Sequence, residues 1–228
     1  MKAFSVAWRA LVSYYNDLFF LAGMSLLWWV TGGVFAGAAI LAGWVLLRSN
    51  GPWWLAPLLA IPAGPASAAL ANAARRSARD LHVDRTLYLD GLRLYWRQAL
   101  ALSAVSMAVL SLLLLNILFY SSRNTALLWA LTFFWGYLSA FWIGVQVYLY
   151  PVLVGLDTPT VPGALRIALA MAFANPIFSL VLLVLAAIIT CVSVALAVTL
   201  FAAWPAVMIL LGEHSVRFIV DRAAQKSL

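Results

Sequence analysis

Side chains that could perform catalysis or hold a metal are few in this 228-residue sequence, and they are kept apart from one another. His82 and His214 lie in hydrophilic segments, and neither has a second candidate ligand beside it or belongs to a zinc-protease helix motif. Glu213 is adjacent to His214, but consecutive helical residues point in different directions. We therefore expect solvated histidines, no metal site, no cofactor and no enzymatic activity.

The sequence also lacks a recognisable phosphate-binding loop and has too few cysteines for a disulfide or a cysteine-rich metal site. The sequence has no glycine-rich loop of the P-loop or dinucleotide-binding type, so we expect the chain not to hydrolyse ATP itself. The single cysteine, Cys191, excludes an internal disulfide. Because Cys191 lies in an apolar run, we interpret it as a small core residue.

Arginines are the chemically useful side chains that cluster. The hydrophilic segment 75–97 carries six of them, interleaved with aromatic residues and three aspartates. An interfacial position with snorkelling arginines explains this pattern, and a docking platform for a partner is the functional alternative. A GxxxG match in the first apolar run adds a face that permits close helix contact, inside the bundle or between subunits. The candidate partner contacts are Arg75, Arg76, Arg79, Tyr95, Trp96, Arg97, Gly33 and Gly37.

Two further features lie within the apolar runs. Pro62, Gly64 and Pro65 interrupt the second run, and a broken helix can build a binding site where its freed backbone lines a cavity. A kink satisfied by neighbouring helices is the structural alternative. Asn116 and Gln146 are the deepest amides, and either could line a polar cavity or form a hydrogen bond across helices. No ionisable residue lies near the middle of a predicted span, which disfavours ion-coupled transport.

These residues must be positioned by a chain that is 66% hydrophobic and only 9% charged. An average soluble domain is about 45–50% apolar and about 25% charged. Because no soluble core could bury so much apolar surface, the excess must face lipid. We predict an all-α, polytopic integral membrane bundle in which residues 1–228 form one domain. The net charge of +7 then indicates orientation and attraction to anionic lipid, not nucleic-acid binding.

Apolar runs define the predicted spans, since a membrane helix needs about 20 such residues. The last run, 177–212, would extend about 54 Å as one helix, beyond the hydrocarbon thickness of about 30 Å. We therefore expect a hairpin there, although no turn sequence marks the division and one long helix stays open. The six predicted spans are 18–47, 53–74, 98–120, 126–150, 177–193 and 194–212.

The distribution of Lys and Arg predicts the orientation of these spans. With both termini cytoplasmic, 12 of the 14 basic residues lie inside, and only Arg48 and Arg123 lie outside. This agrees with the positive-inside rule. It makes 75–97 a cytoplasmic segment and 213–228 a cytoplasmic tail of a multi-pass protein in a bacterial cytoplasmic membrane.

The six spans form three hairpins, and a short interfacial helix is predicted before each one. The first, 1–17, has an apolar face made of Phe4, Trp8, Leu11, Val12 and Tyr15. The second repeats this spacing with Tyr88, Leu92, Tyr95, Trp96 and Ala99. Leu165-Arg166 marks a degenerate third copy.

Several short motifs along the chain resemble those of one family. They are Gly64-Pro65-Ala66-Ser67-Ala68-Ala69-Leu70 with Arg75-Arg76, then Leu92-Arg93-Leu94-Tyr95-Trp96-Arg97-Gln98-Ala99-Leu100, Tyr150-Pro151 and Ala174-Asn175-Pro176. Through these motifs, over most of its length, the chain resembles the YesL family of bacterial membrane proteins. The resemblance implies a protein that assists carbohydrate ABC importers, and it implies no established catalytic or binding residues.

Two main hypotheses of function follow. The first is a non-enzymatic accessory subunit of a carbohydrate ABC uptake system, with permease subunits, a second copy of the chain and membrane lipids, anionic at the cytoplasmic face, as candidate partners. The second is a small transporter or channel in its own right, not coupled to an ion through a carboxylate within the membrane. A third, an enzyme acting on lipid, lacks a recognisable nucleophile and base.

Overall fold

The computed structural model describes residues 2–79, 81, 84, 86–122 and 125–226, so the predictions for His82, Arg85 and Arg123 lie outside the described residues. Within these ranges every element is a helix. In chain order the elements are α1 (Lys2–Asn16), α2 (Leu18–Trp28), the π-helical η1 (Trp29–Gly33), α3 (Val34–Arg48), the 3₁₀-helical η2 (Trp53–Ala60), α4 (Ala63–Ser77), α5 (Thr86–Ser121), α6 (Ala126–Gly155), α7 (Val161–Ala174), α8 (Pro176–Ala195), α9 (Ala197–Ala202) and α10 (Trp204–Lys226).

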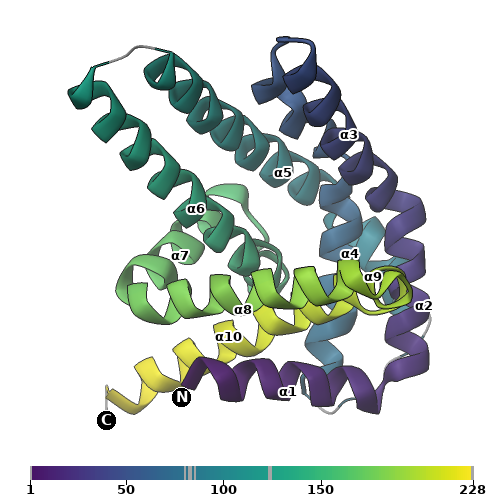
Figure 1. Ribbon diagram of the computed structural model, residues 1–228. Helices are drawn as coiled ribbons and strands as arrows, with labels where there is room; N and C mark the ends of the chain where they lie inside the picture. The colour runs from purple at the N-terminus through teal and green to yellow at the C-terminus, as the bar shows by residue number, and fades with distance from the viewer. Residues whose placement is uncertain (1, 80, 82–83, 85, 123–124, 227–228) are drawn as a thin grey trace.

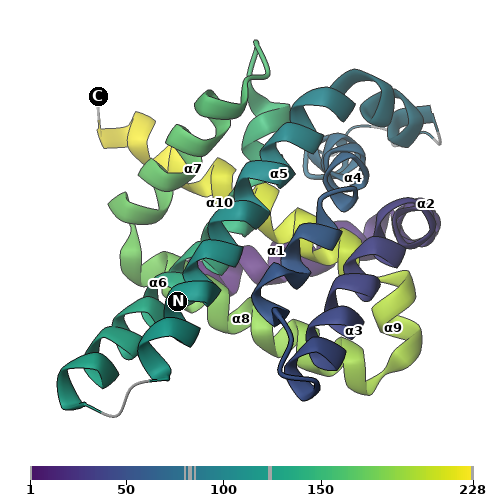
Figure 2. The same ribbon diagram turned by 90° about the horizontal axis from the view of Figure 1, so that it is seen from above.

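The helices run in three directions (Figure 1). α2, α3 and α4 stand upright on one side, and α5 and α6 rise obliquely on the other. α1, α8 and α10 run crosswise in the lower half, and both chain termini lie at this end. Figure 2 gives the same arrangement from above, with α2 seen end-on and α8 lying across the view. The fold is therefore an upright bundle above a layer of crosswise helices.

α1 corresponds to the predicted first amphipathic helix, and it has two apolar faces. Its small side chains, among them Ala3, Ala7 and Ala10, are buried, and α1 packs against α10. Its large aromatic side chains are exposed, with Phe4 67%, Trp8 61% and Tyr15 76% accessible. An exposed aromatic stripe is typical of a helix that lies in a membrane interface.

The first apolar run forms one continuous helix through α2, η1 and α3, 31 residues from Leu18 to Arg48. The π-helical turn places Gly32 against α4, where a Cβ at Gly32 would lie 2.7 Å from the Cβ of Ala66. Gly33 is covered by the rings of Trp28 and Trp29 in its own helix, whereas a Cβ at Gly37 would meet nothing. Close contact within the chain is therefore made by Gly32, a neighbour of the predicted motif.

The second apolar run is broken as the prolines predict. η2 and α4 meet at an angle of 47°, with Pro62 as the residue before α4 and Pro65 in its first turn. The backbone at the break is paired locally, since Ile61 N donates to Leu58 O at 3.2 Å and Gly64 N donates to Ile61 O at 3.1 Å. Gly64 packs on α5, where its Cβ would lie 2.6 Å from Ala99 O. The break thus serves helix packing.

α5 differs from the sequence prediction. The separate interfacial helix expected before the third span is wrong, because Thr86–Ser121 is one helix of 36 residues. Most of its predicted apolar stripe packs inside the protein: Tyr88, Tyr95 and Ala99 are buried, and α5 packs against α4 along this stretch. Trp96 of the same stripe is exposed. Apolar residues have the same helical spacing whether they face lipid or another helix, so the spacing alone could not distinguish the membrane interface from a contact with α4.

The last apolar run divides into a hairpin, although not where we expected. α8 ends at Ala195, the short helix α9 makes the turn, and α10 begins at Trp204. α10 then continues to Lys226, so the predicted tail 213–228 is largely helical. The hairpin lies across α2 rather than alongside it (Figures 1 and 2).

Among the described residues, four helices are long and apolar enough to cross a membrane. They are Leu18–Arg48, Thr86–Ser121, Leu127–Gly155 and Pro176–Ala195, and the bent pair of η2 and α4 would be a fifth. α10 is not among them, since it carries Glu213, Arg217 and Asp221 along its length. The chain is therefore a helical protein with several apolar helices compatible with a membrane.

Gly64→Ala should destabilise the fold, because the new methyl group would meet the backbone of α5 at Ala99. Overpacking of this kind costs about 1–3 kcal/mol. We expect a lower midpoint of thermal unfolding in detergent. Gly37→Ala is the matched control, and its midpoint should be unchanged or higher. Equal midpoints for the two variants would show that α4 and α5 are not packed this closely.

Candidate functional site

Charged side chains gather at one end of the bundle, which we call the basic end and define by Arg9, Arg75, Arg76, Arg79 and Arg217. α4 positions three of these arginines in and just beyond its last turn. Positive side chains there interact favourably with the negative end of the helix dipole. α1 supplies Arg9 and α10 supplies Arg217, so three helices far apart in sequence build this end.

A carboxylate is buried within the basic end. The Glu213 side chain is 2% exposed, and its Oε2 atom has no hydrogen-bond partner among the described residues. Burial raises the pKa of the Glu213 carboxyl above its ordinary value, and the positive charges of Arg75, Arg217 and Arg79 oppose this shift. Glu213 is therefore a buried carboxyl group that interacts electrostatically with three nearby arginines.

Glu213 is buried although it is the first residue of the predicted cytoplasmic tail, and Gly212 supplies the reason. α10 crosses α6 at this glycine so closely that a Cβ there would overlap Val147 O and lie 2.9 Å from Pro151 Cγ. The close crossing carries the next residue, Glu213, into the protein. A glycine directly before a carboxylate, with Arg217 one helical turn later, is the signal in the sequence that could have indicated this.

Four of the predicted partner contacts meet at one cavity of about 340 Å³. Tyr95 forms a buried wall, while Arg76 and Arg79 are exposed at its rim. Arg75 lies over the end of α6, where a Cβ at Gly155 would be 2.6 Å from its Nη1 atom. The residues that line this arginine pocket are Asn72, Arg75, Arg76, Arg79, Leu81, Tyr95 and Val154.

The other predicted contacts lie elsewhere. Trp96 and Arg97 are exposed on α5, and the Arg97 guanidinium lies 5.3 Å from the centre of the Trp96 ring. Neither lines the arginine pocket. Gly33 and Gly37 lie in η1 and α3, on a different part of the bundle. The proposed set of contacts thus separates into a pocket, an exposed pair on α5 and two glycines, of which Gly33 is buried.

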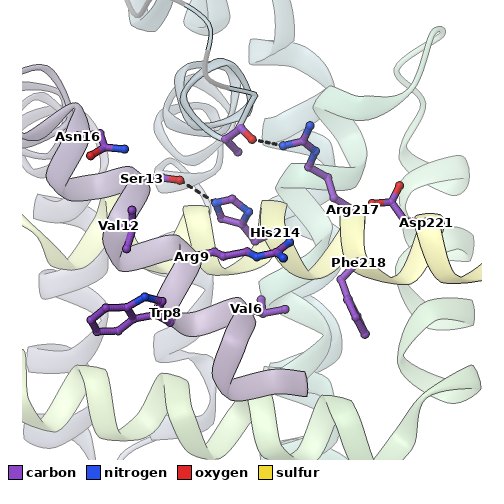
Figure 3. A pocket seen from close by; sticks show the side chains of 11 residues that line it. Val6, Trp8, Arg9, Val12, Ser13, Asn16, His214, Arg217, Phe218 and Asp221 are labelled. Carbon is purple, nitrogen blue, oxygen red and sulfur yellow. Dashed lines mark hydrogen bonds between the residues drawn. The ribbon is translucent and has the colours of Figure 1, made fainter. Parts of the chain in front are cut away.

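A second cavity at the basic end, of about 570 Å³, lies between α1 and α10 (Figure 3). Arg9 from α1 and Arg217 from α10 both line it. His214 also lines it, half-buried and 3.0 Å from Ser13 Oγ by a hydrogen bond between side chains. The prediction of a solvated His214 therefore does not describe its environment.

A third cavity, of about 520 Å³, is mainly apolar and lies among α6, α8 and α10. Gln146 lines it, together with Tyr150 and Thr190. Asn116 does not line it, and its Nδ2 atom donates to Leu112 O within α5 at 2.8 Å. Cys191 is exposed and lines this cavity, so our interpretation of it as a core residue is wrong.

No protein-family model, curated protein or solved structure matches this chain. The geometry of the basic end and of the three cavities therefore carries the functional argument.

Glu213→Gln should remove a pH dependence of stability. A carboxyl whose pKa is raised on folding contributes its full stability below its unfolded pKa, near 4.5, and loses it as the pH rises through the folded value. Thermal unfolding of the wild type in detergent should therefore shift to lower temperature over that pH range, and that of the variant should shift less. Asp90→Asn, on the exposed face of α5, is the control and should behave like the wild type. Identical pH profiles for wild type and Glu213→Gln would contradict the burial of a charge.

Proposed function

We propose that the protein is a non-enzymatic accessory subunit that holds an acidic segment of a membrane transport partner at its arginine pocket. The observation that carries this proposal is the convergence of Arg75, Arg76 and Arg79 on one cavity at the basic end. Arginine presents five N–H donors in a planar fork that fits carboxylates in two-point contacts. The resemblance in sequence motifs points to permease subunits of a carbohydrate ABC uptake system as the partner.

The burial of the pocket residues supports a docking role. Arg75 faces the buried Glu213 carboxylate, so its charge is partly compensated inside the protein. Arg76 and Arg79 are exposed and present their charge outward. Tyr95 gives the cavity a rigid aromatic wall, of the kind enriched at protein interfaces. The pocket therefore has one arginine, Arg75, that is held in place inside the protein, and two exposed arginines that an acidic ligand can reach.

Reversing the charge at the rim of the pocket should release the partner. In the double variant Arg76→Glu with Arg79→Glu, recovery of permease subunits with the tagged protein from native membranes in mild detergent should fall at least about tenfold, or about 1.4 kcal/mol. Mass spectrometry of the co-eluting subunits is the measurement.

The control for this experiment is Arg93→Glu with Arg166→Glu, which changes the total charge equally at exposed positions outside the pocket. Recovery with the control should equal that of the wild type. If the wild type elutes without permease subunits, the accessory role is wrong. If both double variants lose them equally, total charge and not the pocket holds the partner.

A second candidate function rests on the apolar cavity that Gln146 lines. A small transporter would use this cavity as its route, and a route must admit water during the cycle. Cys191, the single cysteine of the chain, provides a reporter on its wall.

For the transporter, Cys191 in reconstituted vesicles should react with a charged, membrane-impermeant methanethiosulfonate reagent. A Cys191→Ala protein that carries Val184→Cys is the control, since Val184 is exposed on α8 away from this cavity and should stay unreactive in lipid. Absence of labelling at Cys191 would exclude a wetted route through the cavity.

A further inference from the structure

Two cavities meet on either side of Phe218 in α10. The first is the cavity of about 570 Å³ between α1 and α10, lined by Arg9 and Arg217. The second, of about 350 Å³, is enclosed by the start of α1, the start of α8 and Phe218. Phe218 lines both, and its ring stacks on Phe178 with the ring centres 5.4 Å apart. Phe218 is therefore a wall that the two cavities share, and we treat them as the cationic part and the apolar part of one groove beside α10.

The cationic part has an excess of positive charge. Arg217 donates one N–H to the carbonyl oxygen of Ala78, which leaves the other donors of its five to a ligand. Figure 3 shows the Arg9 side chain extending from α1 toward α10, and Asp221 beside Arg217. A further arginine, Arg222, lines the apolar part. Across the two cavities, three arginines stand against Asp221 and the buried Glu213, which lies near Arg217. The groove therefore keeps a net positive charge and favours an anion.

The apolar part is suited to a hydrocarbon chain. Ile177, Phe178 and Val181 line it along the first turns of α8, a helix apolar enough to lie in a membrane. Ile177 is 78% exposed and Val181 is 41% exposed, so this wall opens away from the protein. α1 lies at the same groove, and its exposed aromatic stripe is typical of a helix in a membrane interface. We therefore expect the groove at the depth of lipid headgroups. The ligand must then be anionic at one end and apolar at the other.

We propose that this groove binds one anionic phospholipid, with its phosphate between Arg9 and Arg217 and one acyl chain against Ile177, Phe178 and Val181. Charge-assisted hydrogen bonds from guanidinium to phosphate are the expected polar contacts. The lipid contacts α1, α8 and α10 together, and it thereby stabilises the docking of α1 on the rest of the protein. This site is separate from the arginine pocket, and it does not depend on the proposed permease partner.

The test is binding of phosphatidylglycerol to the full chain in detergent, followed as a rise in unfolding temperature and counted by native mass spectrometry. We expect one lipid retained per chain and a rise in the unfolding temperature of the wild type. Arg9→Gln should weaken the apparent affinity by about tenfold or more, because it removes charge-assisted hydrogen bonds to the phosphate. Arg166→Gln, exposed on α7, is the matched control and should bind as the wild type does.

Filling the apolar part of the groove with a large side chain is a second, independent test of lipid binding, because it changes no charge. Val181→Trp should fill this part and reduce lipid retention, whereas Val184→Trp, on the same helix outside the groove, should not. Equal retention by wild type, Arg9→Gln and Val181→Trp would overturn the proposal. An equal response to phosphatidylcholine would overturn its requirement for an anion. If inorganic phosphate alone reproduced the rise in unfolding temperature, the site would bind free phosphate and not a lipid.

Discussion

The close packing of α4 against its neighbours is the constraint on which the rest of the structure depends. α4 is rich in alanine, and glycines on both sides let backbones approach it: Gly32 meets Ala66, Gly91 meets Ala69, and Gly64 of α4 itself meets Ala99 of α5. In lipid, where apolar surface gains nothing by leaving solvent, such van der Waals contact between small residues is a main source of helix association. Fixing α4 also fixes the arginines at its end.

Arg75 connects this packing to the electrostatics of the basic end. It belongs to α4, lies against Gly155 at the end of α6, and faces the buried Glu213 of α10. A buried charge cluster of this kind adds little net stability, since desolvation offsets the attraction between the charges. Its effect is to make the positions of three helices depend on one another. The arginine pocket therefore has a packed side formed by Arg75 and an exposed side formed by Arg76 and Arg79.

The sequence predicts those parts of the fold that a single physical property determines, such as the hydropathy of a segment or the presence of proline. Length and hydropathy indicated the apolar helices, and Pro62 with Pro65 indicated the break before α4. The helical spacing of apolar residues could not predict what covers them, because a face in contact with lipid and a face in contact with protein have the same spacing. Tyr88 and Tyr95 could have faced lipid or α4, and they are buried where α5 packs on α4. The burial of Glu213 could not be predicted because it depends on how closely α10 crosses α6, a contact between segments distant in the chain. Of the candidate partner contacts, the three arginines in and just beyond the last turn of α4 did converge, with Tyr95, on one cavity.

The docking of α1 has a consequence for how the protein is made. Its partners come from the far end of the chain: Tyr14 donates to Ala202 O, and Ser13 is bonded to His214. α1 leaves the ribosome long before α10, so the surface that covers its alanine face does not exist until α10 has been synthesised. During that interval the alanine face of α1 stays uncovered. The docking of α1 is thus a late step of assembly.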